Sequence, residues 1–189
     1  MNTETAIRAV ATAANGRPVV FASGNPALVA KRIADRPNHF YADGASGFVS
    51  SIGIGVALHA RSTTIIVDDP DSLLANLAAL VTAGTLTDLP LVHIVLDRVR
   101  ASGGAALNER ADLCGLAMAA GYPRTYTLER TEELGDLVRR EIARCPSPVF
   151  VRCLLSDSTS PAVARIGRRR RIADRSERDD PPAWFTEAA

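Results

Sequence analysis

The chain has 189 residues, with 22 Lys or Arg against 21 Asp or Glu, so its formal net charge is +1. A chain of this length can bury a core as one domain. No apolar run reaches the roughly 20 residues of a membrane span, and near-neutral charge gives no general attraction to nucleic acid. A membrane protein, a secreted disulfide-rich domain and a disordered chain are therefore excluded, and we expect a cytoplasmic protein.

Apolar segments of strand length alternate along the chain with segments of helical periodicity. The expected strands are 18–23, 63–67, 89–96, 124–128 and 148–155. The expected helices are 26–35, 48–60, 73–82, 108–120 and 132–144. A glycine-bearing loop lies near 39–48. Short strands separated by helices require crossover connections, so the pattern predicts parallel pairing.

We therefore expect an α/β fold: a single domain with a mainly parallel sheet and helices on both faces. The domain should cover 1–155, and 156–189 should form a charged carboxyl-terminal tail that packs on a partner subunit. Such sheets bind ligands beyond the carboxyl ends of their strands. The segments that follow Val67 and Leu96, together with the glycine loop near Gly44, are therefore the candidate binding region.

Single polar side chains are weaker candidates for chemistry. His93 lies within an apolar strand segment and is expected to be a core histidine. His39 precedes the glycine loop and is a candidate to face a substrate. Cys114 and Cys153 lie in apolar stretches and are expected to be buried thiols, because no cysteine pair or Cys/His cluster has metal-site spacing.

The segment Asp68-Asp69-Pro70-Asp71-Ser72 has a structural explanation of its own. An aspartate followed by proline is a common helix opening, with Asp69 as the N-cap and Pro70 at the first helical position. Asp71 then complements the helix dipole in the first turn. This segment needs no ligand to explain its composition.

Taken in order, several segments resemble the diphosphate-binding domain of thiamine diphosphate-dependent decarboxylases, above all the sulfopyruvate and phosphonopyruvate decarboxylase group. They are HFYADGASGFVSSIGIGVAL, IIVDDPDSLLANLAAL, LPLVHIVLDR, SGGAALNERADLCGLAMAAGYPRTYTLERTEEL and PVFVRCLL. The resemblance covers about 18–155. It implies the thiamine diphosphate-binding fold, a carbon–carbon lyase activity, thiamine diphosphate with Mg²⁺ as cofactors, and a small anionic 2-keto acid as substrate.

The resemblance also implies which residues meet the cofactor. The family's bulky wedge loop corresponds to Gly44, Ala45 and Ser46, where Ser46 is small and polar. Its Gly-Asp-Gly metal motif corresponds to the segment holding Asp69, Asp71 and Ser72, which keeps an aspartate and loses the glycines. Asp69 is accordingly the implied metal ligand.

The family's second metal ligand is an asparagine after the next strand, and in this chain the matching pair is Asp97-Arg98. A guanidinium cannot ligate a metal. Three interpretations stay open: conventional Mg²⁺ binding, replacement of the metal by Arg98, which can grip phosphate bidentately, or pairing of Arg98 with Asp68, Asp69 or Asp97.

In this family each active site lies between two domains, and the second, pyrimidine-binding domain supplies a glutamate. The resemblance therefore implies a partner subunit that carries the pyrimidine half. Two functions stay open: the diphosphate-binding subunit of a two-subunit 2-keto acid decarboxylase, or a degenerate, non-catalytic subunit that scaffolds or regulates such a partner. A nucleic-acid role through the arginines at 168–171 is not expected, because nearby acidic residues nearly cancel their charge.

Overall fold

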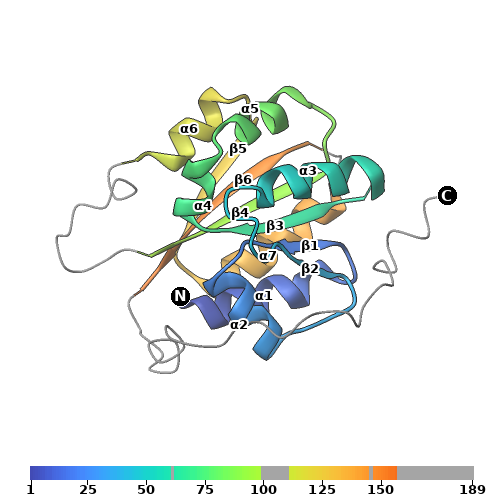
Figure 1. Cartoon of the computed structure of the whole chain (residues 1–189), viewed down its shortest axis with the longest axis vertical. Coiled ribbons are helices and arrows are strands. Elements are labelled where there is room, and N and C mark those ends of the chain that lie inside the picture. The colour runs from blue at the N-terminus through green and yellow to red at the C-terminus, as the bar shows by residue number, and fades with distance from the viewer. Residues whose placement is uncertain (61, 99–110, 145–146, 157–189) are drawn as a thin grey trace.

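The fold is built on one sheet of six parallel strands (Figure 1). A computed structural model describes residues 1–60, 62–98, 111–144 and 147–156. The strands are β1 Val19–Phe21, β2 His39–Tyr41, β3 Thr64–Asp68, β4 Leu91–Arg98, β5 Arg124–Leu128 and β6 Val149–Leu155. Their order is β2-β1-β3-β4-β6-β5, and every neighbouring pair is parallel. The expected α/β fold with a parallel sheet is confirmed.

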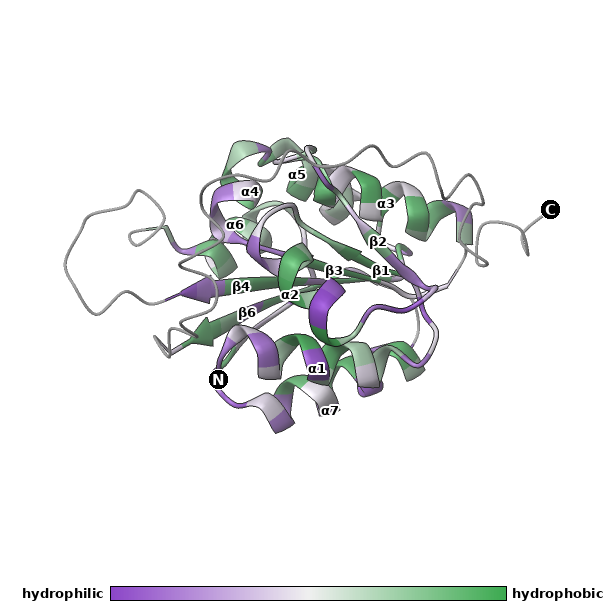
Figure 2. Cartoon of the chain, turned by 60° about the horizontal axis from the view of Figure 1, so that its bottom comes forward, coloured by the Kyte–Doolittle hydropathy of each residue, from purple (hydrophilic) through white to green (hydrophobic). Residues whose placement is uncertain are grey.

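Seven helices in the described residues cover the two faces of the sheet (Figures 1 and 2). They are α1 Thr3–Ala14, α2 Asn25–Ile33, α3 Val49–Ala60, α4 Pro70–Ala75, α5 Ala78–Thr85, α6 Leu113–Ala119 and α7 Thr131–Ala143. One buried cluster joins α1, α2 and α7 to the sheet, and a second joins α3, α4, α5 and α6 to the opposite face. The two layers are called below the α1 layer and the α3 layer.

Some elements differ from the sequence prediction. Helix α1 was not expected, although Asn2 and Thr5 form a capping box at its start. Strand β2 lies where only a loop was expected. It has only three residues and lies at the edge of the sheet, so its sequence shows no continuous apolar run. The helix expected at 73–82 is two helices, since α4 ends at a C-cap, Asn76. The tail at 157–189 and its arginines lie outside the described residues.

The order of the strands creates a reversal point between β1 and β3. From β1 the chain moves outward to β2, whereas from β3 it moves the other way to β4. In parallel sheets a crevice opens at the carboxyl ends of the strands at such a point. The segments after β3 and β4 lie at the same edge, because Asp68 pairs with Val95 in parallel register. This edge, formed by residues 22–24, 42–48, 69–72 and 97–98, is called the carboxyl rim.

Candidate functional site

Two loops of the carboxyl rim are packed against each other. The Gly47 backbone N–H donates to Ser72 Oγ at 3.3 Å, which joins the loop after β2 to the first turn of α4. Gly47 has a φ of +81°, and a Cβ there would lie 3.1 Å from Ala75 Cβ, so glycine fits both the conformation and the close approach. The loop residues Gly44 and Ser46 are exposed at the rim. The sequence-predicted residues Gly44, Ala45, Ser46 and Ser72 are therefore brought together.

Asp69 acts as the N-cap of α4. Its Oδ1 accepts a hydrogen bond from the Ser72 N–H at 3.0 Å, and Pro70 follows at the first helical position, as expected. Burial raises the pKa of the Asp69 carboxyl, and the Ser72 hydrogen bond partly opposes this; the negative charges of Asp68 and Asp71 raise the pKa further. The carboxylate is thus already engaged by the helix and lies in a field that disfavours another anion.

Behind the rim, four polar side chains form a buried cluster. His93 Nε2 lies 3.3 Å from Asp68 Oδ2, and His93 Nδ1 lies 3.2 Å from the Tyr122 hydroxyl. Ser50 Oγ donates to Asp68 Oδ2 at 3.2 Å and lies 3.5 Å from His93 Nε2. The His93 and Asp68 side chains expose no surface. His93 is therefore a core histidine, as expected from the sequence.

This cluster contains Ser, His and Asp but does not have the geometry of an acyl-transfer triad. In such a triad the serine and the carboxylate bond to opposite nitrogens of the imidazole. Here Ser50 and Asp68 both approach Nε2, and the tyrosine occupies the Nδ1 side. Because the imidazole is also inaccessible to a substrate, the cluster ties β3 and β4 to α3.

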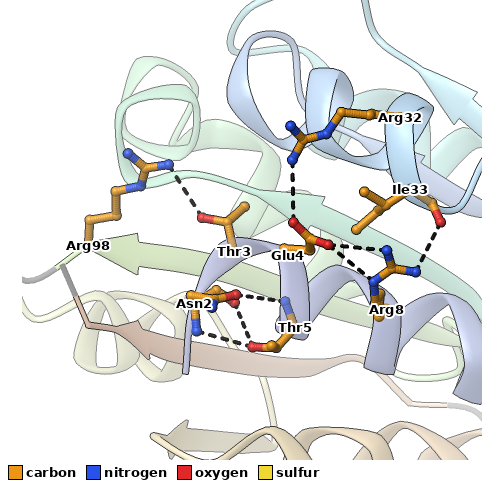
Figure 3. A network of polar contacts seen from close by, with 8 residues as sticks. All are labelled: Asn2, Thr3, Glu4, Thr5, Arg8, Arg32, Ile33 and Arg98. Atoms are coloured by element: carbon orange, nitrogen blue, oxygen red, sulfur yellow. Dashed lines mark hydrogen bonds and ion pairs between the residues drawn. The ribbon is translucent and has the colours of Figure 1, made fainter. Parts of the chain in front are cut away.

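Asp97 and Arg98 end β4 and point to opposite faces of the sheet, as successive strand residues do. Asp97 Oδ2 accepts from Arg152 Nε of β6 at 2.7 Å, on the side of the α3 layer. Arg98 Nη2 donates instead to Thr3 Oγ1 in the first turn of α1 at 3.3 Å (Figure 3). The structure therefore does not bring Arg98 together with Asp69.

The expectation that Arg98 pairs with Asp68, Asp69 or Asp97 is wrong for the described residues. Asp68 contacts His93, and Asp97 forms its ion pair with Arg152. The reason is strand alternation: Arg98 belongs to the same side of β4 as Leu96, which packs in the α1 layer. The Ser-Gly-Gly sequence at 102–104 lies outside the described residues.

The described residues give no support for a magnesium site held by this chain. Among them, no three His, Cys, Asp or Glu side chains lie close enough together to hold a metal ion. Mg²⁺ needs an octahedral set of hard oxygen ligands. Asp69 caps α4, Asp68 is buried beside an imidazole, and Asp97 is neutralised by a guanidinium. The donors that the resemblance implies are thus in use for other purposes.

His39 does not face the rim. Its side chain is buried beside the rings of Phe21 and Tyr41, which it meets edge-on. Burial, assisted by the positive charge of Arg36 and opposed by Asp35, lowers the pKa of His39 to about 4. The idea that this imidazole contacts a substrate is therefore wrong.

Sequence reasoning missed three polar residues that contact the predicted ones: Ser50, Tyr122 and Arg152. Arg152 carried a recognisable signal, because an arginine inside the apolar run VFVRCLL requires an acidic partner when its strand is buried. Ser50 and Tyr122 carried none, since each is an unremarkable residue until the fold places it beside His93.

A hollow of about 590 Å³ lies away from the rim, at the amino edge of the sheet. Its polar lining includes Arg17, Ser62, Thr85, Thr87, Asp88 and Arg144. These residues precede β3 and β4 or lie at helix ends, so they are separated from the rim by the length of the strands. The hollow is not part of the candidate site.

Comparisons with known proteins agree with this fold. The chain is 34% identical to a phosphonopyruvate decarboxylase from Streptomyces viridochromogenes over 66% of this chain and 32% of that protein. It is 30% identical to sulfopyruvate decarboxylase subunit beta from Methanococcus maripaludis over 70% of this chain and 73% of the subunit. An enzyme from Mycobacterium smegmatis, assigned as thiamin diphosphate-dependent, shares the fold with a TM-score of 0.68 at 22% identity, over 82% of this chain and 32% of that one.

The chain thus spans about a third of the phosphonopyruvate decarboxylase and most of the beta subunit. No family model matches it. Within the described residues, none of the helices combines the length and apolar character needed to cross a bilayer. The identity and coverage shared with the beta subunit place the chain in the sulfopyruvate and phosphonopyruvate decarboxylase group.

Proposed function

We propose that this chain is the diphosphate-binding subunit of a two-subunit thiamine diphosphate-dependent 2-keto acid decarboxylase. The observation that carries the proposal is the extent of the match to a beta subunit, 73% of its length at 30% identity. The position of the loops after β2 and β3 at one rim, joined by the Gly47–Ser72 hydrogen bond, supports a ligand site there.

The partner of this subunit is proposed to be a chain that carries the pyrimidine-binding half. The name of the Methanococcus relative, subunit beta, assigns that protein to an assembly with a different subunit. The rim of the present chain supplies loops and carboxylates on one side of a crevice, and we propose that the second chain closes the other side. The domain of 1–155 would form this half-site, with the tail at 156–189 on the partner.

Thiamine diphosphate is the proposed cofactor, which would supply an electron sink for loss of carbon dioxide from a 2-keto acid. The loop of Gly44, Ala45 and Ser46 and the first turn of α4, with Asp71 and Ser72, are the residues proposed to face it. No role is assigned to a metal held by this chain, because no cluster of metal-binding side chains is found among the described residues.

Arg98 is the cation proposed to meet an anion at the rim. Its side chain is exposed and, among the described residues, is held by a hydrogen bond to Thr3, so it can turn toward a ligand at the end of β4. A sulfonate or phosphonate group of a small 2-keto acid has the charge and geometry that a guanidinium binds. Asp69 lies on the other side of the sheet and would not share this anion.

A second function, a non-catalytic subunit that scaffolds or regulates an active partner, is favoured by one specific observation. Two rim carboxylates and one behind the rim have structural partners: Asp69 with the Ser72 amide, Asp97 with Arg152, and Asp68 with His93. Under this function the chain would retain the fold and the subunit contact without contributing ligands to the cofactor.

The two functions are separated by experiments on this chain co-expressed with the pyrimidine-type chain. Calorimetric titration with thiamine diphosphate is done with Mg²⁺ and with EDTA, and release of carbon dioxide is measured with sulfopyruvate and phosphonopyruvate. Saturable cofactor binding and decarboxylation support the first function. A stable complex in which Arg98→Ala and the exposed control Arg139→Ala leave decarboxylation of both acids equally unchanged supports the second. Absence of any complex overturns both.

A further inference from the structure

The hollow at the amino edge of the sheet crosses the starts of four neighbouring strands. Its lining comes from the segments that precede β1, β3, β4 and β6, which are adjacent in that order. Its volume of about 590 Å³ falls within the range of about 300–1,000 Å³ that small-molecule sites occupy. The carboxyl rim lies at the other end of the same strands. The hollow is therefore large enough for a ligand of its own, separate from the candidate site.

The positive charges of the hollow lie at its two outer ends. Arg17 precedes β1 and Arg144 precedes β6, and β3 and β4 lie between these strands. Neighbouring strands are about 4.8 Å apart, so the strand starts that follow the two arginines are separated by about 14 Å. Both side chains are exposed. Within the described residues, Arg17 is hydrogen-bonded through its backbone and not through its guanidinium, so the fold leaves this cation available to a ligand.

Arg144 lies beside a carboxylate that already has another cation. Its Nη1 is 3.5 Å from Glu141 Oε1, and Arg140 Nε is also 3.5 Å from that oxygen. The other oxygen, Glu141 Oε2, accepts a hydrogen bond from Arg124. One buried carboxylate thus meets three guanidiniums, which leaves positive charge in excess. Arg144 can therefore bind an anion in the hollow without leaving Glu141 unpaired.

The middle of the hollow has the opposite electrostatic character. Helices α3 and α5 end there, at Ala60 and Thr85, and the carboxyl end of a helix carries partial negative charge. Asp88, between α5 and β4, adds a full negative charge; its carboxylate is exposed and has no partner in the described part of the chain. Helices α1 and α7 end near Arg17 and Arg144, where a full positive charge outweighs the partial one. The lining therefore favours an anion at each outer end and a cation between them.

Apolar and hydroxyl groups complete the lining. Leu58, Leu89 and Pro90 supply apolar surface. The hydroxyls of Ser62 and Thr87 also line the hollow, and neither has a hydrogen-bond partner among the residues that the structure describes. A mostly apolar wall with a few convergent polar groups is typical of a small-molecule site. A short carbon chain can lie against this wall while the hydroxyls donate to its acid groups.

We propose that the hollow binds a small amino diacid, a molecule with two acid groups and an ammonium group on the carbon chain that joins them. One acid group meets Arg17 and the other meets Arg144, since a guanidinium binds a carboxylate bidentately. The ammonium group meets Asp88 and the carboxyl ends of α3 and α5. The lining has two arginines and one aspartate, so each of its charges has an opposite charge on such a ligand. This inference does not depend on the proposed function, because the hollow and the rim lie at opposite ends of the strands.

The test is calorimetric titration of the full chain with L-glutamate and L-aspartate at low salt. Two matched probes each lack one group of L-glutamate: glutarate lacks the ammonium group, and 4-aminobutyrate lacks one carboxylate. Saturable binding of an amino diacid is expected, and both probes should bind at least about tenfold more weakly, because each leaves a charged group of the lining unpaired. If neither amino acid binds saturably, or if glutarate binds as tightly as L-glutamate, the inference is overturned.

Variants of the lining locate the ligand. Arg17→Met and Arg144→Met should each weaken binding of the amino diacid at least about tenfold. Asp88→Asn should weaken it too, and should remove the preference over glutarate. Arg139→Met is the matched control, because Arg139 is an exposed arginine of α7 outside the lining, and thermal unfolding checks that every variant is folded. Equal affinity in Arg17→Met, Arg144→Met and the control would place the ligand elsewhere and overturn the inference.

Titration of the same variants with thiamine diphosphate, in the complex with the pyrimidine-type chain, separates the two proposals. Binding of the cofactor without binding of an amino diacid contradicts this inference alone. Binding of an amino diacid without binding of the cofactor contradicts the catalytic function proposed above and leaves this inference standing.

Discussion

Asp68 Oδ2 and His93 Nε2 lie 3.3 Å apart in the core, where neither side chain exposes any surface. Asp68 is the last residue of β3, and its other oxygen accepts the Asp69 N–H at 2.8 Å. The first aspartate of the acidic segment is thus fixed between the core and the loop that opens α4. It holds the rim in place and is not a ligand that the rim presents.

The effects of substituting Asp68 and His93 on the free energy of unfolding should be strongly coupled. His93→Phe removes one partner of the buried carboxylate, which should lower the free energy of unfolding by about 3–5 kcal/mol. The double variant Asp68→Leu/His93→Phe should lose less than the sum of the two single variants, because neither group is then left unpaired. Urea denaturation of the four chains measures this. Arg98→Ala, at an exposed position, is the control and should change stability by less than about 0.5 kcal/mol; additive losses would contradict the coupling.

The sequence allowed the fold to be predicted because β3, β4 and β6 are buried on both faces and appear as continuous apolar runs. The same property prevented prediction of the site. In a strand that is apolar on both sides, the pattern does not reveal which helix layer a given residue faces. Asp97 and Arg98 were therefore placed at the correct edge but could not be assigned to opposite faces. Short β2 has too few residues for any pattern to show.

At neutral pH the negative charge of Asp69 should lower the free energy of unfolding, whereas the N-cap hydrogen bond of the same side chain should raise it. Its raised pKa means that the folded chain holds the proton more tightly than the unfolded chain, so stability falls as pH rises through the folded pKa. Asp69→Asn keeps an equally good N-cap and removes the charge, so it should be more stable than wild type at pH 7. The gain should vanish below the ordinary aspartate pKa of 3.8, where both states are protonated.

Asp69→Ala is the matched comparison, because it removes the charge and the cap together. It should be less stable than Asp69→Asn by about 1 kcal/mol at all pH values. Thermal or urea unfolding at pH 7 and pH 3.5 measures both variants. If Asp69→Asn were less stable than wild type at pH 7, the carboxylate would have a stabilising contact that the cap does not account for.

His39 should make stability depend on pH in the weakly acidic range. Its pKa of about 4 in the folded chain lies below the ordinary value of 6.5, so the unfolded chain binds more protons between these values. The contribution of His39 to the free energy of unfolding is therefore fully present above pH 6.5, and it is lost as the pH falls from 6.5 toward 4. His39→Leu should flatten that decline and change stability at pH 7 by less than about 1.5 kcal/mol, since Nε2 has no hydrogen-bond partner among the described residues. Exposed His59→Gln is the control and should keep the decline; an unchanged slope in His39→Leu would contradict the assignment.

The Asp97–Arg152 pair should contribute more to stability than a surface ion pair. Asp97 Oδ2 accepts from Nε at 2.7 Å and Nη2 lies 2.6 Å away, with the Asp97 side chain 10% exposed. Arg152→Met keeps the apolar stem and removes the guanidinium, so the nearly buried carboxylate loses its cation, at a cost of about 2–3 kcal/mol. Arg139→Met is the matched control, because Arg139 pairs with Asp136 where both side chains are mostly exposed, and it should cost less than about 1 kcal/mol. Urea unfolding compares the two variants, and equal losses would mean that Asp97 is solvated rather than held by Arg152.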